Sequence, residues 1–253
     1  VVELQKNPLR DTIFGVITTV IMLGILSIFA VIFVIPFVQE WPYQVSFSLE
    51  HVKSVISDPD LLGVYTNSLF VAVMTAIIGV LISYGAALVT ARSTLNAKLK
   101  SVVEAIALVI NTIPGMVLGI AFMLTFTGTN LQSTFIILII CDVVHYFSTP
   151  YLMVKNSLSK MNASWETTAM LMGDSWIKTI IRVVTPNAMS TIIEVFSYYF
   201  VNAMVTISAI IFLAGAHTMV ITTKIKELQY YNKFNEVFVL SVLILITNII
   251  AKY

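Results

Sequence analysis

The sequence predicts an all-α integral membrane protein with six transmembrane helices and a polar two-helix hairpin between the fourth and the fifth. Three observations lead to this fold class. Of the 253 residues, 58% are hydrophobic and only 11% are charged, whereas soluble domains are about 25% charged. The mean hydropathy is +0.94. Six apolar segments are also long enough, or nearly so, to cross about 30 Å of hydrocarbon, which takes roughly 20 helical residues.

The apolar segments organise the whole chain, residues 1–253, as one membrane domain. They lie at 12–38, 61–91, 105–127, 131–153, 188–214 and 237–251. Each is predicted to be helical because lipid offers no hydrogen-bond partner to an open backbone. The first is too long for the core of a signal peptide and lacks a cleavage pattern, so we expect it to be retained. Because the chain begins with Val1, we expect the natural N-terminus to precede it.

The basic residues predict a cytoplasmic N-terminus, because Lys and Arg gather on the cytoplasmic side of membrane proteins. In that orientation ten of them lie inside and four outside. Those inside are Lys6, Arg10, Arg92, Lys98, Lys100, Lys155, Lys160, Lys178, Arg182 and Lys252, and those outside are Lys53, Lys224, Lys226 and Lys233. The spacing of Ile221, Ile225 and Leu228 predicts a short amphipathic helix at the outer surface, which tolerates lysines.

The loop at 39–60, which lies outside in this orientation, contains an aromatic cluster of Trp41, Pro42, Tyr43 and Phe47. Aromatic side chains gather where a bilayer meets water. The cluster is therefore predicted to anchor the loop at the membrane interface, and a docking surface for an external partner is the alternative.

The third apolar segment contains a break at 111–119. Pro114 removes a helix hydrogen bond, and Gly115 leaves the backbone free to bend. Irregular backbone at membrane depth is tolerated where protein buries it or where it lines a cavity. Both interpretations stay open here, helix packing and a place beside a transport path.

Several polar residues fall inside the apolar segments, and such residues often mark a transport path. Asp142 and His145 are three residues apart and share a helix face. They are interpreted as a structural pair, as part of a path or its gate, or as metal ligands. Asn202, Thr206 and Ser208 lie in a segment rich in small residues, which favours either close helix packing or a substrate path.

The chain lacks the motifs of several enzyme classes. No Gly-x-x-x-x-Gly-Lys-[Ser/Thr] loop occurs, so the sequence predicts no ATP-hydrolysing site of its own. It also lacks His-Glu-x-x-His and Gly-x-Ser-x-Gly. Cys141 is the only cysteine, which excludes an intrachain disulfide. The net charge of +1 gives no basic field for nucleic acid.

The polar hairpin at 157–186 has helical periodicity on both sides of Gly173. Trp165, Ala169 and Met172 recur every three or four residues and predict a first helix. Gly173 supplies the break, and Pro186 is predicted to end the second helix where the next apolar segment begins. The apolar face of the second helix is formed by Trp176, Ile177, Ile180, Ile181 and Val184. The exposed apolar side chains of the hairpin, Trp165, Met170 and Met172 among them, would need a partner to cover them.

These residues resemble the cytoplasmic loop of permease subunits of type I ATP-binding cassette (ABC) importers, the binding-protein-dependent transport family. That loop reads Glu-Ala-Ala, three residues, Gly, nine residues, Ile-x-Leu-Pro. Gly173 and Pro186 match its spacing, 167–169 (Thr-Thr-Ala) occupy the Glu-Ala-Ala positions, and Glu166 stands one place earlier. The segment 113–119 resembles permeases for ferric iron, 2-aminoethylphosphonate and polyamines.

The resemblance implies a permease subunit in the cytoplasmic (inner) membrane of a bacterium, with no cofactor and no enzyme activity in this chain. Its implied partners are two ATPase subunits, which carry ATP and Mg, and an extracytoplasmic substrate-binding protein. A second permease half is also implied, either an identical or homologous subunit or the other half of a longer chain. The lipid bilayer surrounds it, and no nucleic acid is involved. The cargo would be a small solute, with ferric iron or a phosphonate favoured. The residues implied to couple the permease to the ATPase are Trp165, Glu166, Thr167, Thr168, Ala169, Gly173 and Pro186.

A secondary transporter or channel is the competing class. It would use Asp142, His145 and Glu194 as an ion relay and would need no ATPase. An intramembrane enzyme is disfavoured, because the sequence shows no arrangement of nucleophile and base.

Overall fold

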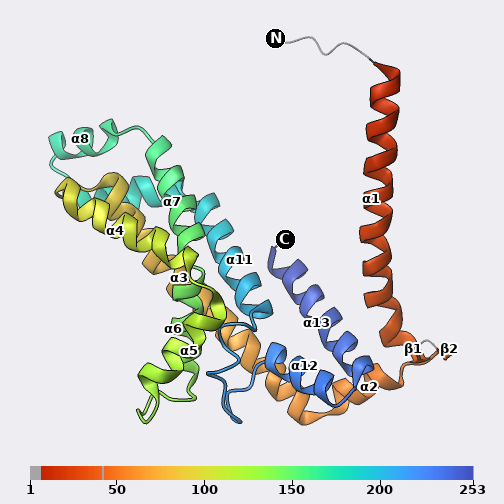
Figure 1. Cartoon of the computed structure of the whole chain (residues 1–253). Helices are drawn as coiled ribbons and strands as arrows, with labels where there is room; N and C mark the ends of the chain where they lie inside the picture. The colour runs from red at the N-terminus through yellow and green to blue at the C-terminus, as the bar shows by residue number, and fades with distance from the viewer. Residues whose placement is uncertain (1–6, 42, 253) are drawn as a thin grey trace. The chain divides into compact units, whose positions relative to one another are not determined.

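The computed structural model describes residues 7–41 and 43–252, apart from the side chain of Glu40. Lys6 and Pro42, which were assigned to the inner side and to the aromatic cluster, lie outside the described residues. The helices, drawn in Figure 1, are α1 (Pro8–Val34), α2 (Glu50–Ser57), α3 (Pro59–Arg92), α4 (Ala97–Val109), α5 (Gly115–Phe126), α6 (Phe135–His145), α7 (Ser148–Lys160), α8 (Ser164–Leu171), α9 (Trp176–Thr179), α10 (Thr185–Asn187), α11 (Met189–Val205), α12 (Ile221–Tyr230) and α13 (Phe234–Lys252). Short helical turns η1 (Ile35–Phe37), η2 (Ile110–Thr112) and η3 (Ile180–Val184) and the strands β1 (Val38–Glu40) and β2 (Gln44–Phe47) complete the described elements. The predicted helical membrane fold is thus confirmed.

The chain divides into two compact units. Of the described residues, the first unit holds those up to Asp58 together with Leu228–Leu243, and the second holds Pro59–Glu227 and those from Ile244 onward.

The first unit starts with α1, whose N-terminus is capped by Asn7. The Asn7 Oδ1 accepts a hydrogen bond from the backbone N–H of Arg10 at 3.3 Å, and Pro8 occupies the first turn, where it needs no N–H partner. No residue of α1 is buried, as expected for a helix that lipid surrounds on all sides.

The loop after α1 in the first unit is a short antiparallel hairpin followed by α2. Val38 pairs with Phe47 across β1 and β2, and the rings of Phe37 and Phe47 stack with their centroids 6.2 Å apart. Tyr43 is 86% exposed and Phe47 is 77% exposed, so the aromatic cluster is open to its surroundings, as interface anchoring requires.

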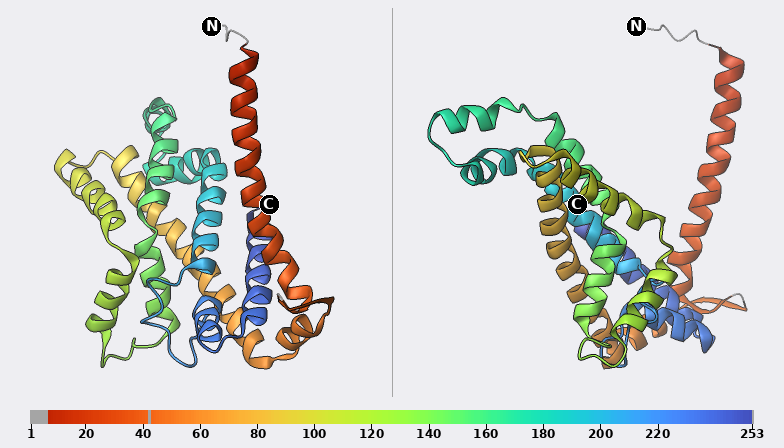
Figure 2. Two further views of the ribbon diagram at one scale, coloured as in Figure 1. Left: turned by 45° about the vertical axis from the view of Figure 1, so that its right-hand side comes forward. Right: turned by 60° about the vertical axis from the view of Figure 1, so that its left-hand side comes forward.

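In the second unit the long helix α3 packs against α11, α7 and α6, and Figure 2 shows these helices side by side. The approach of α11 depends on Gly79, because a Cβ there would lie 2.6 Å from the Tyr199 ring. The apolar core joins α3, α5, α6 and the segment after α11, with Leu138, Cys141, Ala209 and Ile210 at most 1% exposed. The buried part of this unit is therefore built around α3.

Three helical segments are long and apolar enough to cross a membrane alone, namely Pro8–Phe37, α3 and α13. Three more pairs reach that length only together, and each is bent. The bends are 107° between Ala97–Thr112 and α5, 55° between α6 and α7, and 74° between Trp176–Asn187 and α11. The described residues thus provide three candidate spans, or up to six if each bent pair counts as one.

The helix boundaries differ from the predicted segments at three places. The segment 105–127 is split at Pro114, since the residue before a proline favours the extended backbone that Ile113 adopts. The segment 131–153 begins its helix at Phe135, breaks after His145 and runs on to Lys160. The segment 188–214 is helical only to Val205, and the turns beyond it are largely buried in protein, which allows irregular backbone there.

The amphipathic helix predicted from Ile221, Ile225 and Leu228 is present as α12. Ile221 is 1% exposed and Leu228 is 6% exposed, whereas Lys226 on the other face is exposed. The period of 3.6 residues was sufficient to identify this short element.

Candidate functional site

The hairpin at 157–186 turns at Gly173. This glycine has a φ of +83°, its N–H donates to the Met170 carbonyl at 3.1 Å, and the N–H of Asp174 donates to the Ala169 carbonyl at 2.9 Å. These two bonds form a Schellman motif, which ends a helix at a residue with left-handed backbone. The sequence here folds into a helix, α8, with a sharp stop after it.

The second arm of the hairpin begins with α9 and runs to Asn187. Ser175 Oγ accepts from the N–H of Lys178 at 3.3 Å and caps α9, and the helical path continues through η3 and α10 as far as Asn187. Pro186 is the last residue but one of this path, and a bend of 74° separates the path from α11, so the helix ends within one residue of the predicted position.

The turn of the hairpin carries an exposed apolar edge. Met170, Leu171 and Met172 are 71%, 84% and 79% exposed, and Ile177 on α9 is 64% exposed. Trp165, expected to be exposed, is half-buried. Of the residues at the Glu-Ala-Ala positions, Thr167 and Thr168 are exposed and Ala169 is half-buried.

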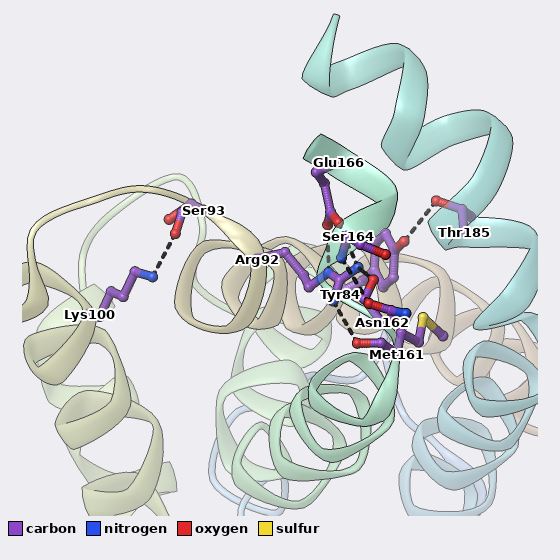
Figure 3. A network of polar contacts seen from close by, with 9 residues as sticks. All are labelled: Tyr84, Arg92, Ser93, Lys100, Met161, Asn162, Ser164, Glu166 and Thr185. Atoms are coloured by element: carbon purple, nitrogen blue, oxygen red, sulfur yellow. Dashed lines mark hydrogen bonds and ion pairs between the residues drawn. The ribbon is translucent and has the colours of Figure 1, made fainter. Parts of the chain in front are cut away.

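Glu166 faces inward and is held by Arg92 at the end of α3 (Figure 3). The Arg92 Nε lies 2.6 Å from Glu166 Oε1, and Nη2 donates to Oε2 at 2.8 Å. The Arg92 side chain is 4% exposed and that of Glu166 is 18% exposed. The Nη2–Oε2 contact is a charge-assisted hydrogen bond, whereas the Nε–Oε1 contact is an ion pair without hydrogen-bond geometry.

An open cavity of about 620 Å³ lies beside this ion pair. Its lining includes Arg92 and Ser93 around the end of α3, Glu166 and Thr167 of α8, and Trp176 of α9. Sequence reasoning placed Arg92 only as a cytoplasmic basic residue, because nothing in the local pattern links it to a glutamate 74 positions away.

The polar residues proposed for a path meet where α6 ends. The Tyr146 hydroxyl lies 2.5 Å from Thr206 Oγ1, which donates to the Asn202 carbonyl at 2.6 Å. The Thr206 carbonyl in turn accepts from Thr222 Oγ1 at 2.6 Å. These bonds connect the residue after α6, the end of α11 and the start of α12. The sequence did not point to Tyr146 or Thr222.

His145 and Ser208 lie at the break in the third predicted span. A Cβ on Gly115 would lie 2.5 Å from Ser208 Oγ and 3.0 Å from His145 Cε1. A Cβ on Gly119 would overlap the backbone carbonyl oxygen of Ala209. The two glycines thus let α5 approach both His145 and the turns after α11.

Asp142 is fully enclosed one turn before His145. Within residues 7–41 and 43–252, neither of its carboxylate oxygens has a hydrogen-bond partner, and the same holds for His145 Nδ1. Asp142 and His145 are therefore not hydrogen-bonded to each other, and the His145 ring instead contacts Tyr146, with ring centroids 4.5 Å apart. A structural role for the two residues and a role in a path both stay predictions. The same described residues contain no group of three His, Cys, Asp or Glu side chains placed to hold a metal.

A second open cavity, of about 630 Å³, follows one face of α11. Glu194, Ser197, Tyr198 and Asn202 line it, with Lys252 at its edge. Their spacing of three and four residues places them on one stripe of the helix. Glu194 thus belongs to a different surface from the enclosed Asp142.

The fold defines the class of protein. The chain superposes with a TM-score of 0.74 on a chain from the crystal structure of a bacterial ABC transporter involved in the import of the acidic polysaccharide alginate, covering 98% of this chain and 96% of that one at 16% identity. An inward-facing MetNI methionine ABC transporter gives a TM-score of 0.60 over 81% of this chain and 94% of that chain, also at 16% identity. The fold is that of a permease of an ABC importer.

The sequence identifies the family. Residues 79–253 match the model of the binding-protein-dependent transport system inner membrane component, and the chain belongs to this family. It is 28% identical over 229 residues to a Haemophilus influenzae protein named as a ferric transport system permease, which covers 87% of this chain and 35% of that protein. It is 25% identical over 191 residues to the molybdate/tungstate transport system permease protein WtpB of Pyrococcus furiosus, over 75% of this chain and 74% of that protein.

The chain spans about a third of the length of the ferric transport permeases that it matches, 35% of the Haemophilus influenzae protein and 31% of one from Actinobacillus pleuropneumoniae. The resemblance drawn from the hairpin residues is confirmed at the level of the family.

Proposed function

We propose that this chain forms the membrane path of an ATP-driven importer that receives a small solute from an external binding protein. The observation that carries the proposal is the hairpin turn, where Met170, Leu171 and Met172 are exposed beside a fixed corner at Gly173. Exposed apolar side chains grouped in this way indicate a surface that a partner covers. The family of the chain makes an ATPase subunit that partner.

Coupling would pass through the hairpin at 157–186. Closure of two ATPase subunits around ATP and Mg would displace α8, and the helices joined to the hairpin would move between inward-facing and outward-facing arrangements. Thr167, Thr168 and Ala169 lie on the α8 turn next to the exposed edge. This chain would contribute no ATP site of its own and no cofactor.

The complete importer would contain two permease halves, two ATPase subunits and one external binding protein in the inner membrane, with the N-terminus of this chain inside. The second half would be another copy, a homologous subunit or a further part of a longer protein. The length of the ferric transport permeases relative to this chain supports the last arrangement.

Ferric iron is the favoured cargo. Two relatives are named for ferric transport, and the cavity along α11 offers the carboxylate of Glu194 with hydroxyl and amide groups from Ser197, Tyr198 and Asn202. Oxygen donors suit a hard cation.

The ion relay of a secondary transporter has less support. It needs Asp142, His145 and Glu194 in one connected series, whereas Asp142 is enclosed and Glu194 lines the separate cavity on α11. In the described part of the chain the Asp142 carboxylate has no hydrogen bond to either of the other two.

The proposal is tested by purifying the tagged permease with its ATPase and adding the cognate binding protein loaded with ferric ion, molybdate or 2-aminoethylphosphonate. We expect stoichiometric recovery of the ATPase and at least fivefold stimulation of ATP hydrolysis by the ferric form only. Stimulation by the molybdate or phosphonate form would contradict ferric iron as the cargo. Consistent absence of an ATPase would contradict the proposal that the chain belongs to an importer.

A further inference from the structure

Arg92 makes an unusually complete set of contacts with the beginning of α8. Besides its two contacts with the Glu166 carboxylate, Nη1 donates to the Met161 carbonyl at 3.0 Å and Nη2 to the Asn162 carbonyl at 3.1 Å. One nearly buried guanidinium therefore holds the loop before α8 and the first turn of α8 (Figure 3). The planar, fork-shaped donor set of arginine allows this, and a lysine could not reproduce it.

The same helix also contacts the other arm of the hairpin. Tyr84 lies on α3, eight residues before Arg92, and its hydroxyl is 2.7 Å from Thr185 Oγ1 on α10. At 1.5 Å per residue, the two contacts are about 12 Å apart along the helix axis. The end of α3 is thus tied to the hairpin both before and after the Gly173 corner.

Helix α3 is also joined to α7 and α11 of its unit. The Tyr151 hydroxyl on α7 donates to Thr90 Oγ1 at 3.0 Å, and Gly79 allows the Tyr199 ring of α11 to lie directly on α3. A displacement of α8 that keeps the Arg92 contacts intact must therefore move α3, and α3 touches the helices that carry the candidate path.

We propose that the Arg92–Glu166 pair is the positioning contact that makes α8 and α3 move as one body when the ATPase acts on the hairpin. In this arrangement Glu166 is engaged within the permease and does not contact the ATPase. The inference rests on the proposed importer function and assigns to Arg92 a role in transmission, with no contact to cargo or nucleotide.

Two other ion pairs in the same unit have a different geometry. Asp174 and Lys178 are four residues apart on the hairpin itself, with side chains 38% and 42% exposed, so their pair is local and worth little. Glu104 and Lys155 join α4 to α7 and do not touch α8. The Glu104–Lys155 pair therefore provides a matched control, since it also links two helices.

The first test measures whether α8 and α3 keep a fixed separation. Spin labels replace Ser164 on α8 and Leu81 on α3, both exposed, in a Cys141→Ala background of the ATPase-bound complex. We expect one interlabel distance, unchanged by ATP plus vanadate, in the otherwise wild-type chain and in Lys155→Gln. In Arg92→Gln the distribution should broaden and shift when ATP plus vanadate is added.

The second test measures coupling in proteoliposomes with binding protein loaded with ferric ion. Arg92→Gln should lower the ratio of stimulated to basal ATP hydrolysis from at least five to near one, Arg92→Lys should lower it by an intermediate factor, and Lys155→Gln by less than twofold. In Arg92→Gln, three quantities should stay within twofold of wild type: recovery of the ATPase, basal hydrolysis and the KM for ATP. General misfolding would lower these as well, so a loss of stimulation alone identifies a loss of coupling.

Two outcomes would overturn the inference. In the first, Arg92→Gln keeps the single fixed distance between the labels. In the second, the Arg92→Gln permease no longer co-purifies with the ATPase, which would make the Arg92–Glu166 pair part of the docking surface. Failure of the wild-type chain to recover an ATPase is a separate result, because it contradicts the importer function itself. Lack of ferric stimulation in the wild type contradicts only the cargo, and the distance measurement still decides the inference.

Discussion

At the scale of single residues, two helix glycines, Gly119 on α5 and Gly85 on α3, differ in their surroundings. Gly119 is buried against the Ala209 backbone, which cannot move without displacing the turns after α11. Gly85 on α3 has nothing within 4 Å of the position of a Cβ. The same substitution should therefore have opposite effects at the two sites.

We expect Gly119→Ala to destabilise the protein by about 3 kcal/mol, the upper end of the range for overpacking. Gly85→Ala should stabilise it by roughly 0.5–1 kcal/mol, because alanine replaces glycine inside a helix. Thermal unfolding in detergent measures both. Equal midpoints for the two variants would contradict the close approach of α5 to Ala209.

The residues that carry sites were only partly predictable from the sequence. Thr206 and Ser208 were selected because polar side chains inside apolar segments are costly. Thr206 is hydrogen-bonded to Tyr146, and Ser208 lies beside Gly115 at the start of α5. The roles of Arg92 and Tyr84 were missed, because an arginine at the end of a long apolar helix looks like an ordinary cytoplasmic flank. Contacts between residues 74 or 101 positions apart leave no local pattern.

At the scale of elements, the corner at Gly173 decides the shape of the hairpin. Its positive φ of +83° costs a residue with a Cβ about 1–2 kcal/mol, whereas asparagine tolerates the left-handed region better. The space around the glycine is open, so backbone conformation alone should set the effect of a substitution.

Gly173→Ala should therefore speed hydrogen exchange of the Asp174 amide by roughly 5- to 30-fold, the factor that 1–2 kcal/mol produces. The matched variant Gly173→Asn should change it much less. Exchange measured by mass spectrometry on hairpin peptides provides the comparison. An unchanged rate in Gly173→Ala would show that the corner does not need the left-handed conformation.

Breaks in helices were predictable only where the sequence contains a strong local signal. Pro114 and Gly115 indicated the break between η2 and α5, and Gly173 indicated the hairpin corner. The end of α11 at Val205 has no proline or glycine beside it, whereas the bend after His145 is followed by Pro150 in the first turn of α7, a signal that was overlooked. Both places also depend on tertiary hydrogen bonds, such as that between Tyr146 and Thr206, which periodicity does not reveal.

At the scale of the whole molecule, composition and the length of the apolar segments were enough to predict a helical membrane protein, and the hairpin spacing was enough to indicate the family. The cargo could not be predicted in the same way, because it depends on side chains brought together by folding and on partners outside this chain. Glu194 illustrates this, since it was considered only for an ion relay and lies with Tyr198 and Asn202 along one cavity.

The most direct test of the importer is uptake of ferric iron by proteoliposomes. Vesicles containing this chain with its permease partner, ATPase and external binding protein should accumulate iron only when ATP is enclosed with the ATPase, and collapsing proton and sodium gradients should leave the rate unchanged. Uptake driven by an ion gradient in vesicles that contain this chain alone, without ATP, would contradict the account.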